Sequence, residues 1–502
     1  MKIWPGADER IATVPERGRG NIAGGRPASY RPGRRREGRS QGLVQTDAAS
    51  AGHRLRGKAV EILTAVDEGS HSDDLLDVAA RGFDDERDRA LLFEIVLGTL
   101  RRRGAVDAVL ANYSSRPLSE CDPPVGSALR TAVYQILFLD RVPDSAAVDG
   151  AVQAARERSG PGAATFVNGV LRQLVRSPMS EREALMAESE SHPAWLANRI
   201  VSQWGEAEGK SILAANDHPA PVALRLRQPV SRESMARELA REGVITRPSL
   251  WVPESLVVET GIAWKSSAFL EGRFTIQDEA TMLVAGLCRA DETKLPSGRG
   301  EQRPLLVVDL CAAPGGKTFA IADAWADQDP LAGAPRIIAC DRHAGRIRRM
   351  RANARRLDSK EVVFLRADAL QPSLAGGRFD LVMLDAPCSG TGVIRRHPEI
   401  RWRLTPAEVD RLAARQMAML DAAVRLCRPG GVLVYSVCSI DRAEGEEVIE
   451  RVLTKHTELA VEDPRPCLPE AARSLLSPRG FLRTFPHRDG MDGHFAVRLR
   501  RS

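Results

Sequence analysis

The sequence is poor in cysteine and has no long hydrophobic run. Eight cysteines are spread over 502 residues, and they form neither a CxxC pair nor a Cys/His cluster, so neither a disulfide scaffold nor a zinc site is favoured. No stretch of 18 consecutive apolar residues is present, which argues against a membrane span. The first residues lack the apolar core of a secretory signal. We therefore expect a cytoplasmic protein without membrane or metal partners.

Lysine is also scarce, with 8 Lys against 64 Arg. The formal net charge is +6, but residues 1–50 hold ten Lys and Arg against five Asp and Glu, so +5 of it lies there. This segment is rich in Gly, Pro, Arg and Ser without apolar periodicity, which predicts a disordered basic tail. Two interpretations stay open. It is either an arm that raises nucleic-acid affinity by counterion release, or a tail without specific function that reflects a start placed too far upstream.

The length predicts more than one domain, and the first is helical. Over residues 54–176, apolar residues recur three and four positions apart and the breaks are short, which predicts an all-α bundle of about six or seven helices. Residues 177–300 have a mixed pattern that predicts a small α/β linker and RNA-binding subdomain. In this subdomain we expect helices at 193–215 and 231–242 and strands at 222–227 and 250–259.

Residues 301–502 alternate between short apolar runs and helix-compatible stretches. Strands buried on both faces have continuous apolar runs, so this pattern predicts a doubly wound, Rossmann-like parallel sheet. The expected strands are 305–310, 336–340, 361–365, 379–385 and 431–437. Thr405, Pro406 and Glu408 form a strong helix-start signal. The fold class expected for the whole chain is therefore α+β and multidomain.

A glycine-rich turn follows the first of these strands, in DLCAAPGGKT at residues 309–318. It is neither GxGxxG nor a P-loop, because Cys311 stands where a P-loop has its first glycine. Asp341 ends the second strand, where a carboxylate accepts ribose hydroxyls, and Asp368 follows the third, where it can accept the adenine amine. Each aspartate alone could be a strand-end cap, but together they predict an S-adenosylmethionine pocket. The expected cofactor-binding residues of the turn are Cys311, Ala312, Ala313, Pro314, Gly315, Gly316 and Lys317.

Two cysteines follow the fourth and fifth strands. Cys388 stands in DAPCSGTG after the strand that ends at Asp385, and Cys438 stands in YSVCSID. Carbon 5 of cytosine is a poor nucleophile until a thiolate adds to carbon 6, so methylation there requires a cysteine in the pocket. Packing alone does not explain two such cysteines beside a cofactor pocket. The pair therefore indicates cytosine-5 chemistry.

These motifs resemble the Sun (RsmB-type, Nol/Nop/Sun) RNA cytosine-5 methyltransferases over about residues 54–500. DLCAAPGGKT, DAPCSGTGVIRRHPEIRW and YSVCSI are similar to the most specific family blocks, and RFTIQDEAT, HPAWL and FPHRDGMDGHF to flanking ones. DRALLFEIVLGTLR, AVYQILFLDRVP and FVNGVLR resemble the NusB-like RNA-binding domain. The resemblance implies an RNA substrate, with 16S ribosomal RNA expected. We expect the protein to be a monomer, although the sequence leaves its oligomeric state open.

The resemblance also implies roles for individual residues. Cys438 would be the nucleophile at carbon 6 and Cys388 would help to release the methylated base. Asp385 would line the cofactor site and contact the cytosine. Cytosine-5 DNA methyltransferases use the Pro-Cys thiol as the nucleophile, so the reverse assignment of the two cysteines is the mechanistic alternative.

The sequence departs from the family pattern at several positions. Val437 replaces a Thr before the nucleophile, Gly445 replaces an Asn, His494 replaces a Phe, and the motif VALRLR is not followed by its usual Asn. None of these changes removes a catalytic group.

Two further hypotheses concern RNA. The first is that basic residues after the Pro-Cys turn hold flanking phosphates; these are Arg395, Arg396, Arg401 and Arg403. For each of them a solvated charged loop is the alternative. The second is a different function class, a non-catalytic NusB-like RNA-binding or ribosome assembly protein. The intact Cys388, Cys438 and pocket aspartates argue against it.

Overall fold

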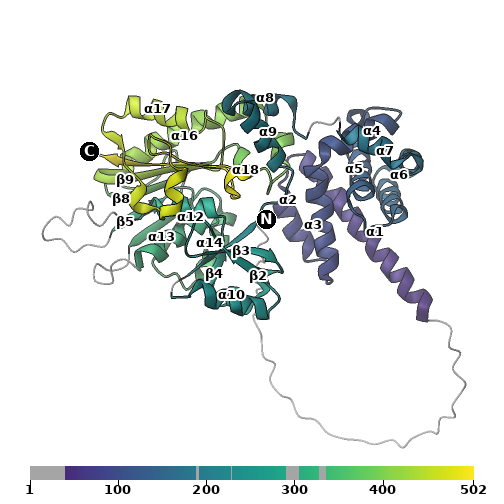
Figure 1. The fold of residues 1–502 in the computed structure, drawn as a ribbon, viewed down its shortest axis with the longest axis horizontal. Coiled ribbons are helices and arrows are strands. Elements are labelled where there is room, and N and C mark those ends of the chain that lie inside the picture. The colour runs from purple at the N-terminus through teal and green to yellow at the C-terminus, as the bar shows by residue number, and fades with distance from the viewer. Residues whose placement is uncertain (1–39, 188–190, 228, 290–304, 327–334) are drawn as a thin grey trace, which may run out of the picture. The chain divides into compact units, whose positions relative to one another are not determined.

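The computed structural model describes residues 40–187, 191–227, 229–289, 305–326 and 335–502, with side chains from residue 52 onward. The chain divides into two compact bodies, and each is described by itself. The first holds most of residues 40–187, and the second holds residues 191–502 together with Leu100–Ala105. Figure 1 labels the helices and strands of both bodies.

The first body is helical throughout, as predicted. Its α-helices are α1 (Ser40–Asp67), α2 (Ser72–Ala80), α3 (Glu86–Arg101), α4 (Arg103–Tyr113), α5 (Pro123–Phe138), α6 (Asp144–Arg176) and α7 (Met179–Ala187). Helix α1 begins inside the segment expected to be a tail, and residues 1–39 of that segment lie outside the described residues. Helix α6 is kinked at Gly160, which has φ 88° and is followed by Pro161, a residue with no N–H to donate.

A small antiparallel sheet opens the second body. Its strand order is β2-β3-β1-β4. Its helices and strands are α8 (Ala194–Trp204), α9 (Glu206–Ala215), β1 (Val222–Leu226), α10 (Arg232–Arg241), β2 (Ile245–Pro248), β3 (Ser255–Thr260), α11 (Ser267–Leu270), β4 (Phe274–Ile276) and α12 (Glu279–Gly286). The helix expected at 193–215 is divided at Gly205, with φ 83°. The strand expected from residue 250 starts only at Ser255, because Ser249 Oγ accepts the N–H groups of Trp251 and Val252 and closes a turn.

The large sheet carries the cofactor-type motifs. Its strands and helices are β5 (Leu306–Asp309), α13 (Gly316–Ala326), β6 (Arg336–Asp341), α14 (Ala344–Arg356), β7 (Val362–Arg366), β8 (Phe379–Asp385), α15 (Ile400–Arg403), α16 (Pro406–Leu426), β9 (Cys427–Val437), α17 (Glu446–Lys455), β10 (Leu459–Val461), β11 (Leu482–Thr484), α18 (Pro486–Asp489) and β12 (His494–Arg501). The strand order is β10-β12-β9-β8-β5-β6-β7, with β11 beside β12.

Strands β5 to β9 pair in parallel as predicted, and the switch point of the sheet lies between β5 and β8. The sheet is nevertheless mixed, because β12 pairs antiparallel with β9, β10 and β11. The apolar, alternating sequence of β12 was not predicted as a strand. This antiparallel strand has a consequence for the site, since it begins at the edge where the parallel strands end.

Helices cover both faces of the large sheet (Figure 1). One face packs against α12, α13 and α14 around Phe319, Ile321 and Met350. The other packs against α16 and α17 around Leu420 and Ile449. Helix α16 starts at the predicted signal, with Thr405 Oγ1 accepting the N–H of Glu408. Among the described helices, none has the length and apolarity needed to cross a membrane.

Candidate active site

The turn between β5 and α13 is held in one shape by its own backbone and by α14. Gly315 N–H donates to Ala312 O at 2.7 Å, and Asn353 Nδ2 on α14 donates to Pro314 O at 3.0 Å. Gly315 has φ +103°, and a Cβ there would lie 2.5 Å from the Phe319 ring. Only glycine satisfies both conditions. The turn therefore presents its backbone closely at the switch point, where doubly wound sheets bind their ligands.

The predicted aspartates line the same edge, in the order of the strands. Asp341 ends β6 and is buried, and its Oδ1 accepts the N–H of His343 at 2.7 Å. Asp368 follows β7 and is exposed, and its Oδ1 accepts the N–H of Leu370 at 3.0 Å. Both carboxylates thus cap turns, and they also stand at the edge that holds the β5–α13 turn. The two roles are compatible, because a carboxylate accepts more than one hydrogen bond.

Asp385 and Lys317 form an ion pair at the centre of this edge. Lys317 Nζ lies 2.7 Å from Asp385 Oδ2, and Ser436 Oγ on β9 donates to Asp385 Oδ1 at 2.5 Å. Burial alone would raise the pKa of Asp385, but the charge and hydrogen bond of Lys317 and the Ser436 hydroxyl hold it below its ordinary value. The carboxyl is therefore ionised at neutral pH, and its side chain keeps 30% of its surface exposed.

Asp309, the last residue of β5, differs from Asp385 in the direction of its pKa shift. It is 1% exposed, accepts from Thr318 Oγ1 at 2.7 Å and has a buried Oδ1 without a partner among the described residues. Burial raises its pKa to about 7 against the opposing hydrogen bond from Thr318. Burial and the nearby carboxylates also raise the pKa of the Cys311 thiol, which stays protonated.

The two predicted cysteines come together. Cys388 Sγ and Cys438 Sγ lie 3.3 Å apart, although 50 residues separate them in the chain. Their strands β8 and β9 are parallel neighbours with Asp385 opposite Ser436, so both cysteines follow the same edge. The hydrogen bond with Cys438 raises the pKa of Cys388 well above its ordinary value, and burial and the nearby negative charges act in the same direction. The Cys388 thiol therefore stays protonated at neutral pH.

A buried glutamate that the sequence did not single out supports the cysteine loop. Glu444 is 0% exposed, and its Oε1 accepts from Ser389 N–H at 2.8 Å and from Gln416 Nε2 at 3.0 Å. Ser389 Oγ donates to its other oxygen. Burial raises the pKa of Glu444 against these hydrogen bonds. Glu444 falls within RAEGEE, a segment whose only noted feature was a glycine in place of the usual Asn. The sequence therefore did not indicate a role for Glu444 in the site.

The arginines expected to hold phosphates are mostly buried in ion pairs, which corrects that prediction. Arg395 is 6% exposed and Arg401 is 0% exposed. Arg395 lies 3.3 Å from Asp492, Arg396 lies 2.5 Å from Asp492 and 2.7 Å from Asp278, and Arg401 lies 2.8 Å from Asp217. Of the four arginines only Arg403 is exposed. A run of arginines in a sequence usually indicates an exposed segment. Here most of the arginines are buried because they pair with acidic side chains from distant segments of the chain.

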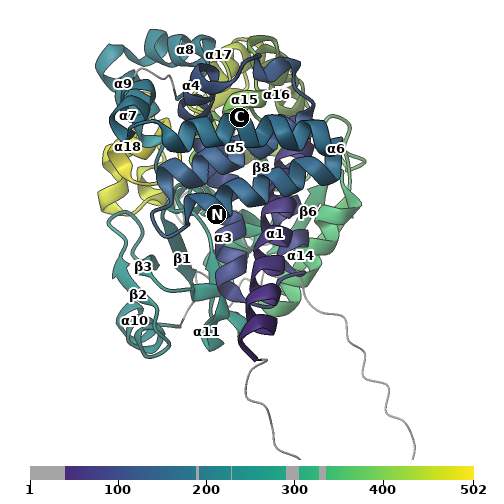
Figure 2. The same cartoon turned by 90° about the vertical axis from the view of Figure 1, so that its right-hand side faces the viewer.

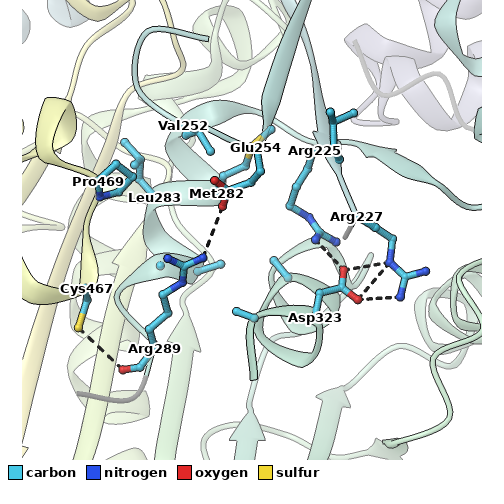
Figure 3. A pocket seen from close by; sticks show the side chains of 15 residues that line it. Arg225, Arg227, Val252, Glu254, Met282, Leu283, Arg289, Asp323, Cys467 and Pro469 are labelled. Atoms are coloured by element: carbon cyan, nitrogen blue, oxygen red, sulfur yellow. Dashed lines mark hydrogen bonds and ion pairs between the residues drawn. The ribbon is translucent and has the colours of Figure 1, made fainter. Parts of the chain in front are cut away.

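A pocket of about 130 Å³ lies elsewhere in this body (Figure 3). Its charged lining is already paired, because Arg225 and Arg227 both contact Asp323, at 2.6 and 2.7 Å. Figure 3 shows these three side chains pointing toward one another. None of the predicted site residues lines this pocket, so the strand-end cluster remains the candidate site.

The chain matches three family models in succession. They are the NusB family over residues 53–176, the Methyltr_RsmF/B-like ferredoxin-like domain over residues 192–264, and 16S rRNA methyltransferase RsmB/F over residues 299–500.

Curated relatives agree with these models. The chain is 34% identical over 441 residues to the ribosomal RNA small subunit methyltransferase B of Xylella fastidiosa strain 9a5c, covering 86% of this chain and 97% of that protein. It is 32% identical over 434 residues to the probable enzyme of that name in Bacillus subtilis strain 168, covering 83% and 91%.

Solved structures are similar as well. The structure described as PH0851 has a TM-score of 0.72 at 25% identity, covering 89% of this chain and 98% of that one. NSun6 from Pyrococcus horikoshii with SFG has a TM-score of 0.51 at 22% identity, covering 62% and 98%, and this likeness concerns the fold alone.

Proposed function

The chain belongs to the ribosomal RNA small subunit methyltransferase B family of S-adenosylmethionine-dependent enzymes, and on that premise we propose that it methylates carbon 5 of a cytosine in 16S ribosomal RNA. The observation that carries the proposal is the pair of sulfur atoms 3.3 Å apart beside the Asp385–Lys317 ion pair. Methyl transfer to a nitrogen or oxygen atom requires no thiol, whereas transfer to carbon 5 requires one at carbon 6.

We assign Cys438 as the nucleophile. Its sulfur forms a bond to carbon 6 of the cytosine, and the electron pair of the 5,6 double bond moves to carbon 5. S-adenosylmethionine, when bound, supplies the electrophilic methyl group. Loss of the carbon 5 proton then restores the double bond and releases the Cys438 thiolate. The covalent step divides one difficult substitution into two easier ones.

We assign Cys388 to release. While Cys438 is free, its hydrogen bond keeps the proton on Cys388. Once the sulfur of Cys438 is bonded to the base, that hydrogen bond is gone and Cys388 can lose its proton to solvent. The Cys388 thiolate then accepts the proton from carbon 5. Glu444, through Ser389, holds the loop that carries Cys388 in place.

Asp385 and Lys317 hold the base. The ionised carboxylate of Asp385 accepts a hydrogen bond from the cytosine amine, and its exposed fraction leaves room for that contact. Lys317 keeps Asp385 ionised while remaining charged itself, since the attraction of Asp385 holds the pKa of Lys317 above its ordinary value against the effect of burial. The target cytosine must reach both sulfurs, so it is single-stranded or turned out of its helix.

The residues of the edge fit the cofactor. At Gly316 a Cβ would make an ordinary contact with the side chain of Gln277, at 3.6 Å. The N-terminus of α13, an 11-residue helix, favours the carboxylate of an amino acid. Asp341 and Asp368 present carboxylates for the ribose hydroxyls and the adenine amine.

We assign RNA phosphate contacts to α14 in place of the buried arginines. This helix has six arginines and no acidic residue in 13 positions. The α14 basic face consists of the exposed arginines on and beside it: Arg342, Arg346, Arg348, Arg349, Arg351 and Arg355. It starts next to Asp341, at the edge of the sheet where β6 ends, and α14 lies beside β6 (Figure 2). Guanidinium groups at this density neutralise RNA phosphates.

The test compares two variants on ribosomal RNA that lacks the modification. Cys438→Ala is expected to abolish both 5-methylcytosine formation and covalent protein–RNA adducts. Cys388→Ala is expected to accumulate an adduct that survives denaturing electrophoresis, because release is blocked. Cys467→Ala, a buried cysteine away from the edge, serves as the control.

Two outcomes contradict the proposal. Adducts with Cys438→Ala but none with Cys388→Ala would reverse the roles of the two cysteines. If the wild-type protein transfers methyl groups to RNA but mass spectrometry of its nucleosides finds them outside carbon 5, the cytosine-5 assignment is wrong.

A further inference from the structure

His494 is buried where β12 begins, beside the end of β9 that leads into the proposed nucleophile. It is the first residue of β12 and is 1% exposed. In the antiparallel pairing of β12 with β9, Phe495 lies opposite Val437 and Ala496 opposite Ser436. Opposite residues of an antiparallel pair share a face, and so do residues two apart on one strand. His494 therefore lies on the sheet face of Ala496 and Ser436, one position beyond the last pair, at the end of β9 that leads into Cys438.

The backbone of Gly392 bridges the segments that carry Cys438 and His494. Gly392 N–H donates to Cys438 O at 3.1 Å, and Gly392 O accepts from Gly493 N–H at 2.8 Å. A Cβ on Gly392 would lie 1.9 Å from Gly493 O, so only glycine allows this close bridge. His494 N–H is itself held by Thr484 Oγ1 at 2.9 Å. The backbone positions of both residues are thus fixed.

The imidazole is a polar group with unfilled hydrogen-bonding capacity. Its Nδ1 is buried and has no hydrogen-bond partner in the part of the chain that the structure describes. Buried polar atoms in native proteins nearly always have a partner. The missing partner of Nδ1 is therefore expected among the groups that enter the site, such as the base or a water molecule next to it.

The charges around His494 keep it neutral. Burial lowers its pKa, and the nearby Lys317 ammonium adds to this, while Asp278, Asp385 and Asp492 oppose it. The two carboxylates away from the centre, Asp278 and Asp492, are neutralised by Arg396. A neutral imidazole has one ring nitrogen that can accept a proton. Such a group at neutral pH is suited to act as a general base.

We propose that His494 is the proton acceptor for Cys438. The inference rests on the proposed cytosine-5 chemistry. As the Cys438 sulfur forms its bond to carbon 6, the thiol proton passes to the free imidazole nitrogen, directly or through one water molecule. When the carbon 6–sulfur bond breaks later, the imidazolium returns the proton to the sulfur. No proton or electron pair is left unaccounted for, and no further reactant is required.

The step explains how the nucleophile is activated at neutral pH. A free thiol is only a few per cent thiolate at pH 7, so an enzyme without a base uses a small fraction of its molecules at any moment. With His494 as acceptor, the rate of attack is expected to change little with pH above the pKa of the imidazole. Without it, the rate follows the thiolate fraction and rises about tenfold per pH unit.

The experiment follows adduct formation on a 16S transcript synthesised with 5-fluorocytidine, in which fluorine cannot leave carbon 5 as a proton does and the adduct persists. Wild type, His494→Phe and His494→Gln are compared between pH 6 and 9. Phe is the residue that the resembling family carries here, so it keeps the packing, and Gln keeps a hydrogen-bonding group but accepts no proton. Thermal unfolding and S-adenosylmethionine binding check that the variants fold.

For both variants we expect adduct formation about 10- to 100-fold slower than wild type at pH 7, with the difference closing toward pH 9 and KM for RNA unchanged. A pH profile of His494→Phe that matches wild type overturns the inference. So does a wild-type profile in His494→Gln, which would make His494 a positioning residue only. If the wild-type protein forms neither adduct nor 5-methylcytosine, the proposed function itself is wrong. This result differs from a failure of the His494 proposal, in which the wild-type protein is active and the variants match its pH profile.

Discussion

Replacing Arg396 by Met tests whether the arginines after the Pro-Cys turn hold the protein together or hold RNA. The side chain is 10% exposed and lies between two carboxylates, 2.5 Å from Asp492 and 2.7 Å from Asp278. It also donates to Pro221 O at 2.9 Å. Met fills a similar volume without charge, so the change leaves both carboxylates buried without their shared partner.

The cost can be worked from Asp492. Burial would raise the pKa of this carboxyl, but the charges of Arg396 and Arg395 hold it at about 2. Against about 3.9 for an unfolded Asp, this difference corresponds to about 2.5 kcal/mol of stability at neutral pH. Removing one partner of a buried pair costs about 3–5 kcal/mol in other proteins. We expect a loss of about 2–5 kcal/mol, which lowers Tm by roughly 5–15 °C.

The loss depends on pH in a defined direction. Because the folded pKa of Asp492 lies below its unfolded value, its contribution to stability is fully present above about pH 4 and disappears as the pH falls toward 2. The difference in unfolding free energy between wild type and Arg396→Met is therefore expected to be full at pH 7 and to shrink below pH 4.

Thermal unfolding followed by circular dichroism measures the effect, and filter binding to RNA measures affinity in parallel. Arg411→Met is the control, because Arg411 pairs with Glu408 on the exposed surface of α16, and no change in its Tm is expected. An Arg396→Met protein with wild-type Tm and weakened, less salt-dependent RNA binding would refute the structural assignment and restore the phosphate interpretation.

Three further predictions follow from the site. Glu444→Gln leaves one acceptor oxygen where the structure uses two. We expect the free energy of unfolding, measured in urea, to fall by about 1–3 kcal/mol and adduct release to become slower. Glu447→Gln, on the exposed side of α17, is the control and is expected to change neither quantity. Gly315→Ala is expected to weaken S-adenosylmethionine binding in calorimetry more than tenfold, because its Cβ meets Phe319, whereas Gly377→Ala, also at positive φ but with open space, leaves it unchanged. Changing three arginines of the α14 basic face to Gln is expected to reduce the slope of log K against log salt for RNA binding by about 2–3 without altering Tm, and an unchanged slope would exclude this face.

Local sequence patterns were sufficient for the cofactor turn and the cysteine pair. DLCAAPGGKT contains the turn, and the apolar runs before Asp341, Asp385 and Cys438 identify strands that share one edge. Parallel strands in a doubly wound sheet all end at that edge, so residues far apart in the chain meet there whatever lies between them. This is why Cys388 and Cys438 could be placed together before their 3.3 Å separation was known.

The charged and polar surroundings could not be derived in the same way. Arg396 and Arg401 look exposed in sequence, because arginines are usually solvated and their partners Asp278, Asp492 and Asp217 lie in other segments. From the sequence alone, Glu444 and His494 had no assigned role in the site. Only packing shows that Glu444 supports the cysteine loop and that His494 is buried at the start of β12.

The sequence by itself thus determined the fold class, the cofactor turn and the two cysteines, since these follow from short-range periodicity and from the common edge of parallel strands. Only the tertiary structure decided which ionisable groups are buried and paired, and that β12 begins with His494 beside the end of β9. The physical reason is that burial and charge pairing depend on contacts between residues tens to hundreds of positions apart, which local patterns do not specify.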